Sequence, residues 1–539
     1  MFILKKNNKQ IIALSMALSV MTTTVFTNIN VYANDLNNTP NVANNTDTIN
    51  KANDIINDVP KDKNGNPLTG EDLKIYNIVK NAPVYTPTDF TPITTETTNQ
   101  ILNVTTKTTK TVFENNDTYY MNRLTFKETK KERYNISIPI KGNTITVRYV
   151  DPVKKQWVNT SNMANLKHTT LFIDTDTNSY IVSVPGVYKN IFTNNTLTIA
   201  RDKEQMVKIE KKDGYFDLQM SFPQDVNLIG EYWYMESNKR LVDWSTMKSF
   251  NELLPHDLSE TRRWSYDGYY FQTPSNYKPG GKDVLYRHPS NYTGASFAKY
   301  AMNPLSKNLG YVMTETCMKN QNGLGYWETG PQSDWLYTDF KIGTGFYDTR
   351  FNTDFATSLL YAYQNYNNKE FLISAVKYAE FFLNFTQTDS YVTQNGGILV
   401  ADYGYHKGTH EKTHVSLNHQ LAEMNFLYEL YNITGEQRYL ETADKMLLGI
   451  EDTRNQWVLL DNNLKYALYY TKNTNPMIDY PYLTYNDLFQ TKFLLKKLFN
   501  KSNDTIEFLM ASKKLWMDRN NVTGYMKEVI EGQDLPILN

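Results

Sequence analysis

The sequence predicts a multidomain β plus α fold, in which an N-terminal antiparallel β-sandwich precedes an (α/α) toroid-like domain of helical hairpins. From about residue 96 to residue 223, short runs such as NISIPI, NTITVRYV and TLTIARD alternate apolar and polar residues, as half-buried strands do. Beyond Glu231 the spacing of apolar residues becomes helical. The chain has 539 residues, 40% of them hydrophobic, and can therefore bury more than one core.

The first residues have the features of a secretory signal peptide. Three lysines lie among the first nine residues, an apolar stretch follows at 11–26, and a small-residue cleavage site ends at Ala33. We expect residues 1–33 to be removed, which makes the mature chain a secreted or cell-surface protein. No later segment is apolar over the roughly 18 residues that a membrane span needs, so no membrane contact is expected after cleavage.

Composition changes again after the signal segment. Residues 34–95 are rich in Asn, Asp, Thr and Pro, which predicts a flexible linker with one short helix around residues 71–79. Residues 96–230 are expected to form the sandwich, with turns at Gly142-Asn143 and Asp213-Gly214. The single cysteine, Cys317, cannot form an internal disulfide, and its surroundings favour a buried helix position over a nucleophile.

Residues 231–539 are expected to form the helical domain. Three helix pairs begin at Phe351, Leu417 and Tyr485, and each opens with an aromatic residue or Leu followed by Asn. Hairpins that cannot bury their apolar faces alone must stack, which predicts an incomplete or full (α/α) toroid, with an open solenoid as the alternative. A tight turn is expected at Thr434-Gly435, and further helices are expected upstream of the first pair.

The loops before the three pairs should build the mouth of a site. In a toroid the first helices of all pairs lie inside, and their N-terminal ends meet on one face. Polar and aromatic loops at 326–350, 402–414 and 465–485 lead into them. Asn352, Asn418 and Asn486 are expected to be helix N-caps, and ligand contact by Asn418 and Asn486 would add to that role.

Four of the seven histidines, His406, His410, His414 and His419, lie close together in the sequence. Spacings of four on a helix would suit a metal, but Gly404 and Gly408 indicate a loop. We therefore expect neither a metal nor a cofactor. His406 and His414 are candidates for sugar contact or for acid–base catalysis.

The first mouth loop is rich in carboxylates. A hydrolase needs two carboxyl groups facing one bond, one of them protonated. Arg350, at the end of this loop, is suited to bind a substrate carboxylate through two hydrogen bonds. The alternative is a salt bridge between Arg350 and a neighbouring carboxylate of the protein. The carboxylates are Glu328, Asp334, Asp339, Asp348 and Asp354.

Residues 417–495 resemble the C-terminal helical domain of D-glucuronyl C5-epimerases. The matching motifs are Leu417-Asn418-His419, Leu427-Tyr428-Glu429-Leu430, Thr434-Gly435, Lys465-Tyr466-Ala467-Leu468, and Asp479-Tyr480 shortly before Asn486-Asp487-Leu488. Where the family has histidines after the Asp-Tyr pair, this chain has Pro481, Tyr482 and Tyr485, and Ala467 replaces an Asp.

The resemblance implies a uronate C5-epimerase-like enzyme, an isomerase acting on glucuronate in a polysaccharide, with Tyr466 and Tyr480 as catalytic residues. Inversion at C5 needs a base and an acid on opposite faces of the ring and a neutralised substrate carboxylate. Tyrosine, with a pKa of about 10, is a poor base unless neighbours lower that pKa, and Lys465, Lys472 or His406 are expected to do so.

Two other functions are open on the same scaffold. A polysaccharide lyase or glycoside hydrolase would draw on Glu328 and Asp334, and a surface carbohydrate-binding protein would bind without turnover. The expected partner is a polysaccharide or oligosaccharide, with Arg350, Asn418, His406, His414, Glu328 and Asn486 as binding residues. The 56 basic and 57 acidic residues nearly cancel, so nucleic acid is not an expected partner, and a homodimer is left open.

Overall fold

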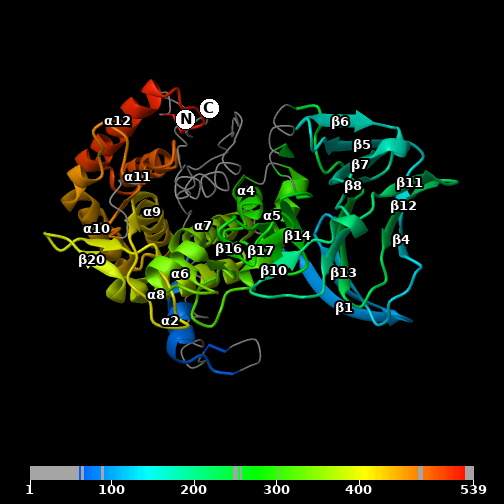
Figure 1. Cartoon of the computed structure of the whole chain (residues 1–539), viewed down its shortest axis with the longest axis horizontal. Helices are drawn as coiled ribbons and strands as arrows, with labels where there is room; N and C mark the ends of the chain where they lie inside the picture. The colour runs from blue at the N-terminus through cyan, green and yellow to red at the C-terminus, as the bar shows by residue number, and fades with distance from the viewer. Residues whose placement is uncertain are drawn as a thin grey trace, which may run out of the picture.

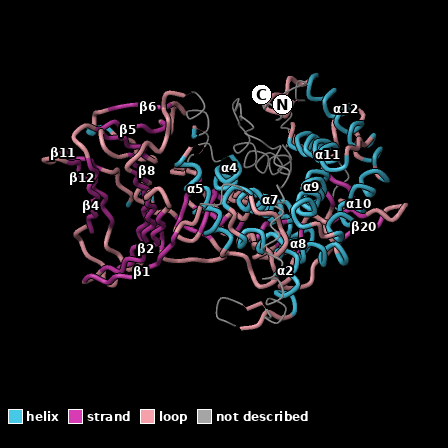
Figure 2. Tube along the Cα trace, turned by 180° about the vertical axis from the view of Figure 1, so that it is seen from behind, coloured by secondary structure: helices cyan, strands magenta, loops and turns pink. Residues whose placement is uncertain are grey.

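The computed structural model describes residues 60–61, 66–85, 90–246, 253–254, 256, 258–300, 303–471 and 478–527. The predicted signal peptide and most of the predicted linker lie outside these ranges. Strands gather on one side of the molecule and helices on the other (Figures 1 and 2). Among the described helices, none is long and apolar enough to cross a membrane.

Two antiparallel sheets form the strand-rich part. The smaller sheet has the order β11 (Lys208–Lys211), β12 (Tyr215–Phe222), β4 (Tyr134–Lys141). The larger sheet has the order β1 (Ile93–Ile101), β2 (Val104–Val112), β3 (Thr118–Phe126), β13 (Leu228–Ser237), β8 (Ser179–Val182), β7 (Leu171–Thr175), β5 (Ile145–Val150), β6 (Trp157–Thr160), and β9 (Gly186–Lys189) also pairs with β13.

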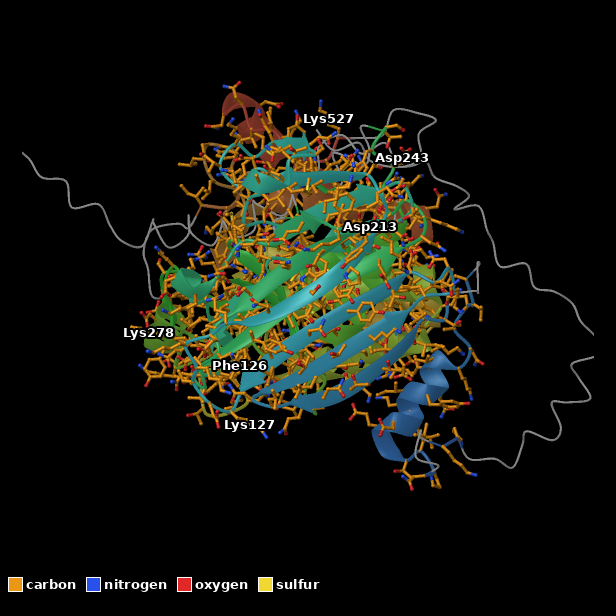
Figure 3. All side chains as sticks on the ribbon, turned by 90° about the vertical axis from the view of Figure 1, so that its right-hand side faces the viewer. Phe126, Lys127, Asp213, Asp243, Lys278 and Lys527 are labelled. Carbon is orange, nitrogen blue, oxygen red and sulfur yellow. The ribbon has the colours of Figure 1, made fainter. Side chains whose placement is uncertain are left out.

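The two faces of the larger sheet have different partners because side chains alternate along each strand. On β3, Leu124 and Phe126 join a core with Ile140 and Phe216 of the smaller sheet. Tyr119, on the opposite face, belongs to the core that the sheet shares with the helices. The predicted antiparallel region is thus present as two packed sheets (Figure 3, where Asp213 marks the β11–β12 turn).

The strand region extends beyond the predicted boundary at residue 231. Strand β13 continues to Ser237, and three later strands join the earlier β10 in a four-stranded sheet with the order β10 (Thr196–Thr198), β17 (Val284–Arg287), β15 (Gly268–Gln272), β14 (Arg262–Ser265). Most of β13 is buried on both of its faces, so it lacks the alternation by which a half-buried strand is recognised in a sequence. The first hairpin helix of the described residues, α4, begins at Tyr292.

Four helical hairpins follow in chain order. Their first helices contact one another in the order α4, α7, α9, α11, and the second helix of each hairpin packs on its first. Figure 1 shows them as an arc. Closure into a toroid is not shown. The hairpins are α4 (Tyr292–Tyr300) with α5 (Pro304–Met318), α7 (Thr349–Tyr366) with α8 (Lys369–Thr388), α9 (Leu417–Thr434) with α10 (Gln437–Asp452), and α11 (Leu483–Phe499) with α12 (Asp504–Arg519).

Left-handed residues end the first helix of the last three hairpins. Asn367, Gly435 and Asn500 have φ values of 53°, 70° and 50° at the ends of α7, α9 and α11. Gly and Asn adopt this conformation at the lowest cost, so each helix stops there and the chain turns back. The predicted turn at Thr434-Gly435 is confirmed.

Helices α2 and α6, in the described part of the chain, lie outside the hairpins. Helix α2 (Gly70–Val79) packs on α8, and its Lys74 pairs with Glu380. It confirms the short helix expected near residues 71–79. Helix α6 (Asp334–Phe340) lies in the first mouth loop. Cys317 is buried in α5, where burial raises the pKa of its thiol to about 12, as expected for a structural cysteine.

Short ladders connect the mouth loops to one another. Strand β19 (Tyr347–Asp348) pairs with β22 (Tyr403–Gly404) directly before α7 begins. Strand β23 (Val415–Ser416) pairs with β24 (Ala467–Leu468) directly before α9 begins. Since each ladder joins two mouth loops, the residues at the starts of α7 and α9 hold fixed positions relative to Tyr403 and Tyr466.

A buried ion pair fastens the third mouth loop to α12. Lys513 is fully buried, and its Nζ lies 2.7 Å from Asp479 Oδ2. The same ammonium donates to Asn463 Oδ1 at 2.6 Å and to the carbonyl oxygen of Tyr480 at 2.7 Å. The position of Tyr480 therefore depends on Lys513.

Replacing Lys513 with Met should lower the free energy of unfolding by about 3–5 kcal/mol, because the Asp479 carboxylate would stay buried without its partner. The neighbouring, part-exposed Lys514 pairs with Asp518 and gives a matched control, since K514M should cost less than about 1 kcal/mol. Urea unfolding of both variants measures the difference. Equal losses would show that Lys513 does not anchor the loop.

Candidate active site

A cavity of about 330 Å³ opens on the concave side of the helical arc. Helices α4, α7, α9 and α11 and the mouth loops before them supply its walls, and we call it the central pocket. Its size falls within the range typical of small-molecule sites. Polar side chains gather where the helices begin, and they include Asp348, Arg350, Asn418, His419, Asn486 and Asp487.

Arg350 connects three of these helices. Its Nε donates to Asp354 Oδ1 at 2.9 Å, one turn along α7. Its Nη1 and Nη2 donate to the two carboxylate oxygens of Asp487 on α11 at 2.7 and 3.1 Å. Nη1 also donates to the carbonyl oxygen of Asn418 on α9 at 2.8 Å. The salt bridge to Asp354 that the sequence suggested is present, and Arg350 is largely engaged by protein groups.

Asp348 lies at the start of α7 and lines the pocket. It caps this helix by accepting a hydrogen bond from the Phe351 backbone N–H at 2.9 Å. Burial raises the pKa of Asp348 to about 8, and the nearby carboxylates of Asp402 and Asp354 add to the effect. Asp348 is therefore a carboxylic acid at neutral pH.

Asp487 differs from Asp348 because its carboxylate is paired with the guanidinium of Arg350. Burial raises the pKa of Asp487 to about 6, and its two bonds with Arg350 oppose a larger rise. At neutral pH Asp487 is therefore ionised. Of these two pocket carboxyl groups, Asp348 is protonated and Asp487 is ionised, which is the pairing that general acid–base chemistry requires.

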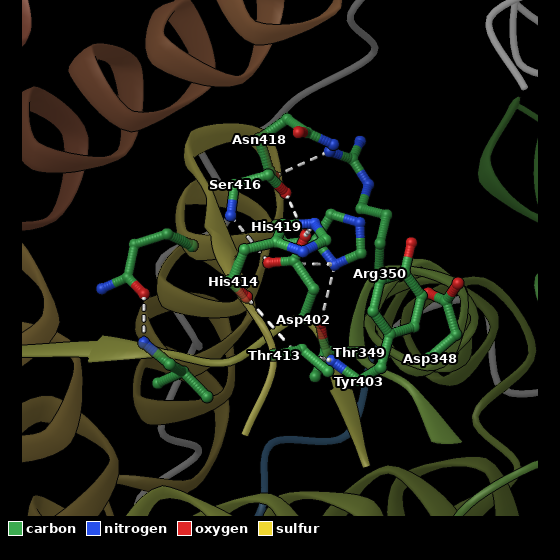
Figure 4. Close-up of polar contacts among 12 residues, drawn as sticks. Asp348, Thr349, Arg350, Asp402, Tyr403, Thr413, His414, Ser416, Asn418 and His419 are labelled. Carbon is green, nitrogen blue, oxygen red and sulfur yellow. Dashed lines mark hydrogen bonds and ion pairs between the residues drawn. The ribbon is translucent and has the colours of Figure 1, made fainter. Parts of the chain in front are cut away.

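A buried network lies behind the pocket wall (Figure 4). Asp402 accepts hydrogen bonds from the backbone N–H and hydroxyl of Ser416 at 2.7 and 2.6 Å, and its Oδ2 lies 3.2 Å from His414 Nε2. His419 lines the pocket, and its Nδ1 lies 2.8 Å from Thr349 Oγ1. Burial lowers the pKa of His419 to about 4, so its ring is neutral near pH 7.

The two predicted catalytic tyrosines meet in the central pocket. The ring centroids of Tyr466 and Tyr480 are 5.6 Å apart in an edge-to-face arrangement. Burial raises the pKa of both phenols. Tyr480 raises the pKa of Tyr466 further. At Tyr480 the hydrogen bond with Tyr466 and the charge of Arg350 oppose the rise without cancelling it. The expectation that neighbours lower these pKa values is wrong. Lys465 and His406 do not line the central pocket, and Lys472 is outside the described residues.

Asn352, Asn418 and Asn486 are not helix caps, which corrects the sequence prediction. Each lies inside the first turn rather than before it. Asn352 accepts from the backbone N–H of Trp327 at 2.7 Å, and Asn486 accepts from that of Met526 at 2.7 Å. Among the described residues Asn418 Oδ1 is buried without a hydrogen-bond partner, and Asn418 lines the pocket. Its amide oxygen is therefore available to a ligand.

Three other predicted binding residues do not line the central pocket: His406, His414 and Glu328. His414 is buried behind it, against the ring of Tyr466. His406 packs between the rings of Tyr326 and Phe381. The loop carrying His406 turns away after the short β22 strand, which the sequence does not indicate.

Glu328 lies in a separate cavity. Its carboxylate pairs with Lys407 at 2.7 Å and lines a space of about 270 Å³ beside the large sheet. Asp334, the other residue assigned to hydrolase chemistry, pairs with Lys278 at 3.0 Å and does not line the central pocket. The many carboxylates in the sequence of the first mouth loop therefore did not predict which carboxylates line the central pocket.

Asp487 and Asp402 are the site residues that sequence reasoning missed. The signal for Asp487 was its position directly after the repeated Asn of the third helix pair, where the second pair has His419. Asp402 carried no signal, because its partners lie 12 or more residues away. In the described part of the chain, no group of three or more His, Cys, Asp or Glu residues could hold a metal ion.

No protein-family model matches the sequence, and no curated protein matches it. Solved structures with some similarity are carbohydrate-processing enzymes. A family 76 glycoside hydrolase from a bovine Bacteroides thetaiotaomicron strain is 12% identical, with 76% of each chain covered and a TM-score of 0.37.

Two further solved structures cover less of both chains. A cellobiose 2-epimerase from Bacillus thermoamylovorans is 12% identical over 46% of this chain and 62% of that chain, with a TM-score of 0.31. An unsaturated glucuronyl hydrolase specific for heparin is 11% identical over 46% of this chain and 64% of that chain, with a TM-score of 0.30. At such low scores, neither a fold family nor an activity follows for this chain, and the resemblance to C5-epimerases stays a prediction.

Proposed function

We propose that this chain is a secreted carbohydrate-active enzyme that hydrolyses glycosidic bonds of a polysaccharide or oligosaccharide in the central pocket. The observation that carries the proposal is the pair of pocket carboxyl groups with separated pKa values, about 8 for Asp348 and about 6 for Asp487. Environments that push two carboxyl groups apart in this way assign one as the acid and the other as the base.

The proposed reaction uses one proton from the enzyme and one water. Asp348 gives its proton to the bridging oxygen as the bond between that oxygen and the anomeric carbon breaks. A water oxygen becomes bonded to the anomeric carbon, and the ionised Asp487 takes the proton that this water loses. The two carboxyl groups return to their starting states when Asp487 passes its proton to solvent and Asp348 regains one.

The charge at the mouth of the pocket favours a neutral sugar over a uronate. Arg350 is already paired with Asp354 and Asp487, so little of its charge remains for a substrate carboxylate. The neutral His419 adds no positive charge near pH 7. Hydroxyl groups of a neutral sugar can instead bond to the free amide oxygen of Asn418 and to the pocket phenols.

Uronate C5-epimerisation is the second candidate, and the meeting of Tyr466 and Tyr480 in the pocket favours it. The protonated Asp348 would then donate a hydrogen bond to the substrate carboxylate and so make the C5 proton more acidic. Because both phenols are neutral at pH 7, they would serve as proton donors, and the base would have to be another group such as the neutral His419.

Replacing Asp348 with Asn should abolish hydrolysis while leaving the fold intact. Asn is as good an N-cap as Asp, so the bond from Phe351 survives, but no proton can be donated. We expect turnover to fall by on the order of a hundredfold or more, with a thermal midpoint close to that of the parent. New reducing ends, measured over a panel of neutral and acidic glycans, give the rate. Full activity in D348N would rule out Asp348 as the acid.

Activity should follow a bell-shaped pH profile with its maximum between about pH 6 and about pH 8. Below about pH 6 the base Asp487 becomes protonated, and above about pH 8 the acid Asp348 loses its proton, so the active form declines on both sides. The profile of kcat/KM tests this directly. An alkaline limb that survives in D348N at residual rates would assign that limb to another group.

Heavy water separates the two candidate reactions. A hydrolase leaves C5 untouched, whereas an epimerase that exchanges its protons with solvent places deuterium at C5 without shortening the chain. We expect shorter chains and no deuterium at C5 over a panel that includes uronate polysaccharides. Deuterium at C5 with unchanged chain length, lost in Y466F or Y480F, would establish the epimerase instead, and binding without either change would favour a non-catalytic protein.

A further inference from the structure

A second polar cluster lines the central pocket away from its mouth. Each of the four inner helices contributes one member: Lys299 from α4, Tyr361 from α7, Glu429 from α9 and Gln490 from α11. The Tyr361 hydroxyl donates to Glu429 Oε1 at 3.2 Å, and Gln490 Nε2 donates to the same oxygen at 3.3 Å. Lys299 Nζ lies 4.4 Å from the centre of the Tyr361 ring. We call these four residues the inner cluster.

Helix geometry separates Tyr361 and Glu429 from the polar residues at the starts of their own helices, whereas Gln490 follows Asp487 by only three residues on α11. Tyr361 follows Arg350 by eleven residues on α7, and Glu429 follows Asn418 by eleven residues on α9. Eleven residues make about three turns, so both members of each pair lie on the same helix face, about 16 Å apart along the axis. The pocket thus presents two sets of polar groups with a span between them.

Small side chains line the space between the two sets. Ala295 on α4, Ser358 on α7 and Ala422 on α9 all face the pocket. A larger side chain at these positions would fill the gap, whereas these three leave room for a ligand to extend from one set to the other. The lining is continuous, because all of these residues surround one cavity.

We infer that the inner cluster is a binding subsite for a second sugar unit, so that the substrate is an oligosaccharide or a chain end with at least two units in the pocket. The chemistry suits such a ligand. The Glu429 carboxylate accepts bonds from hydroxyl groups, the Lys299 ammonium and the Gln490 amide donate them, and the ring of Tyr361 offers an apolar face. This inference rests on the proposed function, because it assumes that the mouth carboxyl groups act on a saccharide.

The test is the double variant K299M/E429Q, which removes both charges and leaves neither one unpaired. Its kinetics are compared on a p-nitrophenyl monoglycoside, which reaches only the mouth, and on the disaccharide to hexasaccharide series of the same sugar. For the oligosaccharides, KM should rise by about tenfold or more, because bonds to charged groups are lost. The monoglycoside should keep its kcat and KM within about twofold.

A matched control is the surface pair Lys492 and Glu507, which joins α11 to α12 away from the pocket. The variant K492M/E507Q should leave both kinds of substrate unchanged. Unchanged oligosaccharide kinetics in K299M/E429Q, or equal losses on both substrates together with a lower thermal midpoint, would overturn the subsite and make the inner cluster a structural ion pair.

A binding measurement tests the subsite independently of the proposed reaction. Calorimetric titration of D348N with the same oligosaccharides needs no turnover. Tighter binding of the disaccharide than of the monosaccharide, lost in the triple variant that adds K299M/E429Q, would support the subsite even if no glycan were hydrolysed. Equal affinity for both sugars would contradict it even in an active hydrolase.

Discussion

The pairing of one guanidinium with two carboxylates holds the site together. Arg350 on α7 bonds to Asp354 on its own helix, to Asp487 on α11 and to the backbone of Asn418 on α9. These helices come from three different hairpins. Because a buried carboxylate without a cation is costly, Arg350 fixes where α11 begins relative to α7.

The burial that makes this pairing necessary also raises the pKa values of the two carboxyl groups on which the proposed catalysis depends. Asp348 lies two residues before Arg350 but does not bond to it, so its carboxyl group is driven toward the protonated form. Asp487 takes the guanidinium and stays ionised near neutral pH. One cation shared unequally between neighbouring carboxyl groups thus produces an acid and a base from the same residue type.

Local pattern was sufficient to predict much of the fold from the sequence. The alternating runs up to Phe222 became strands, and the repeat of an aromatic residue or Leu followed by Asn located α7, α9 and α11 within two residues of their starts. The part of β13 beyond residue 230 and strands β14, β15 and β17 were missed because buried strands lack alternation. Their identity depends on pairing with distant strands, which periodicity does not report.

From the sequence, only the site residues near the repeated helix starts could be predicted. Arg350, Asn418, Asn486, Tyr466 and Tyr480 do line one pocket, because they lie at or before equivalent helix starts. Their catalytic and binding roles remain predictions. His406 and Glu328 were chosen by composition of the loops, and loop composition does not determine which way a side chain faces.

The buried network explains why the sequence at Ser416 to His419 reads as it does. Asp402 binds Ser416 just before α9 and accepts the backbone N–H of Thr349 through its carbonyl oxygen at 3.0 Å, just as α7 begins. Thr349 in turn bonds to His419. A single buried residue, through its carboxylate at α9 and its backbone carbonyl at α7, therefore sets the starts of two inner helices at once. The first turn of α9 needs polar residues because it bonds to a neighbouring helix and lines the pocket. An isolated helix would need only a cap at this end.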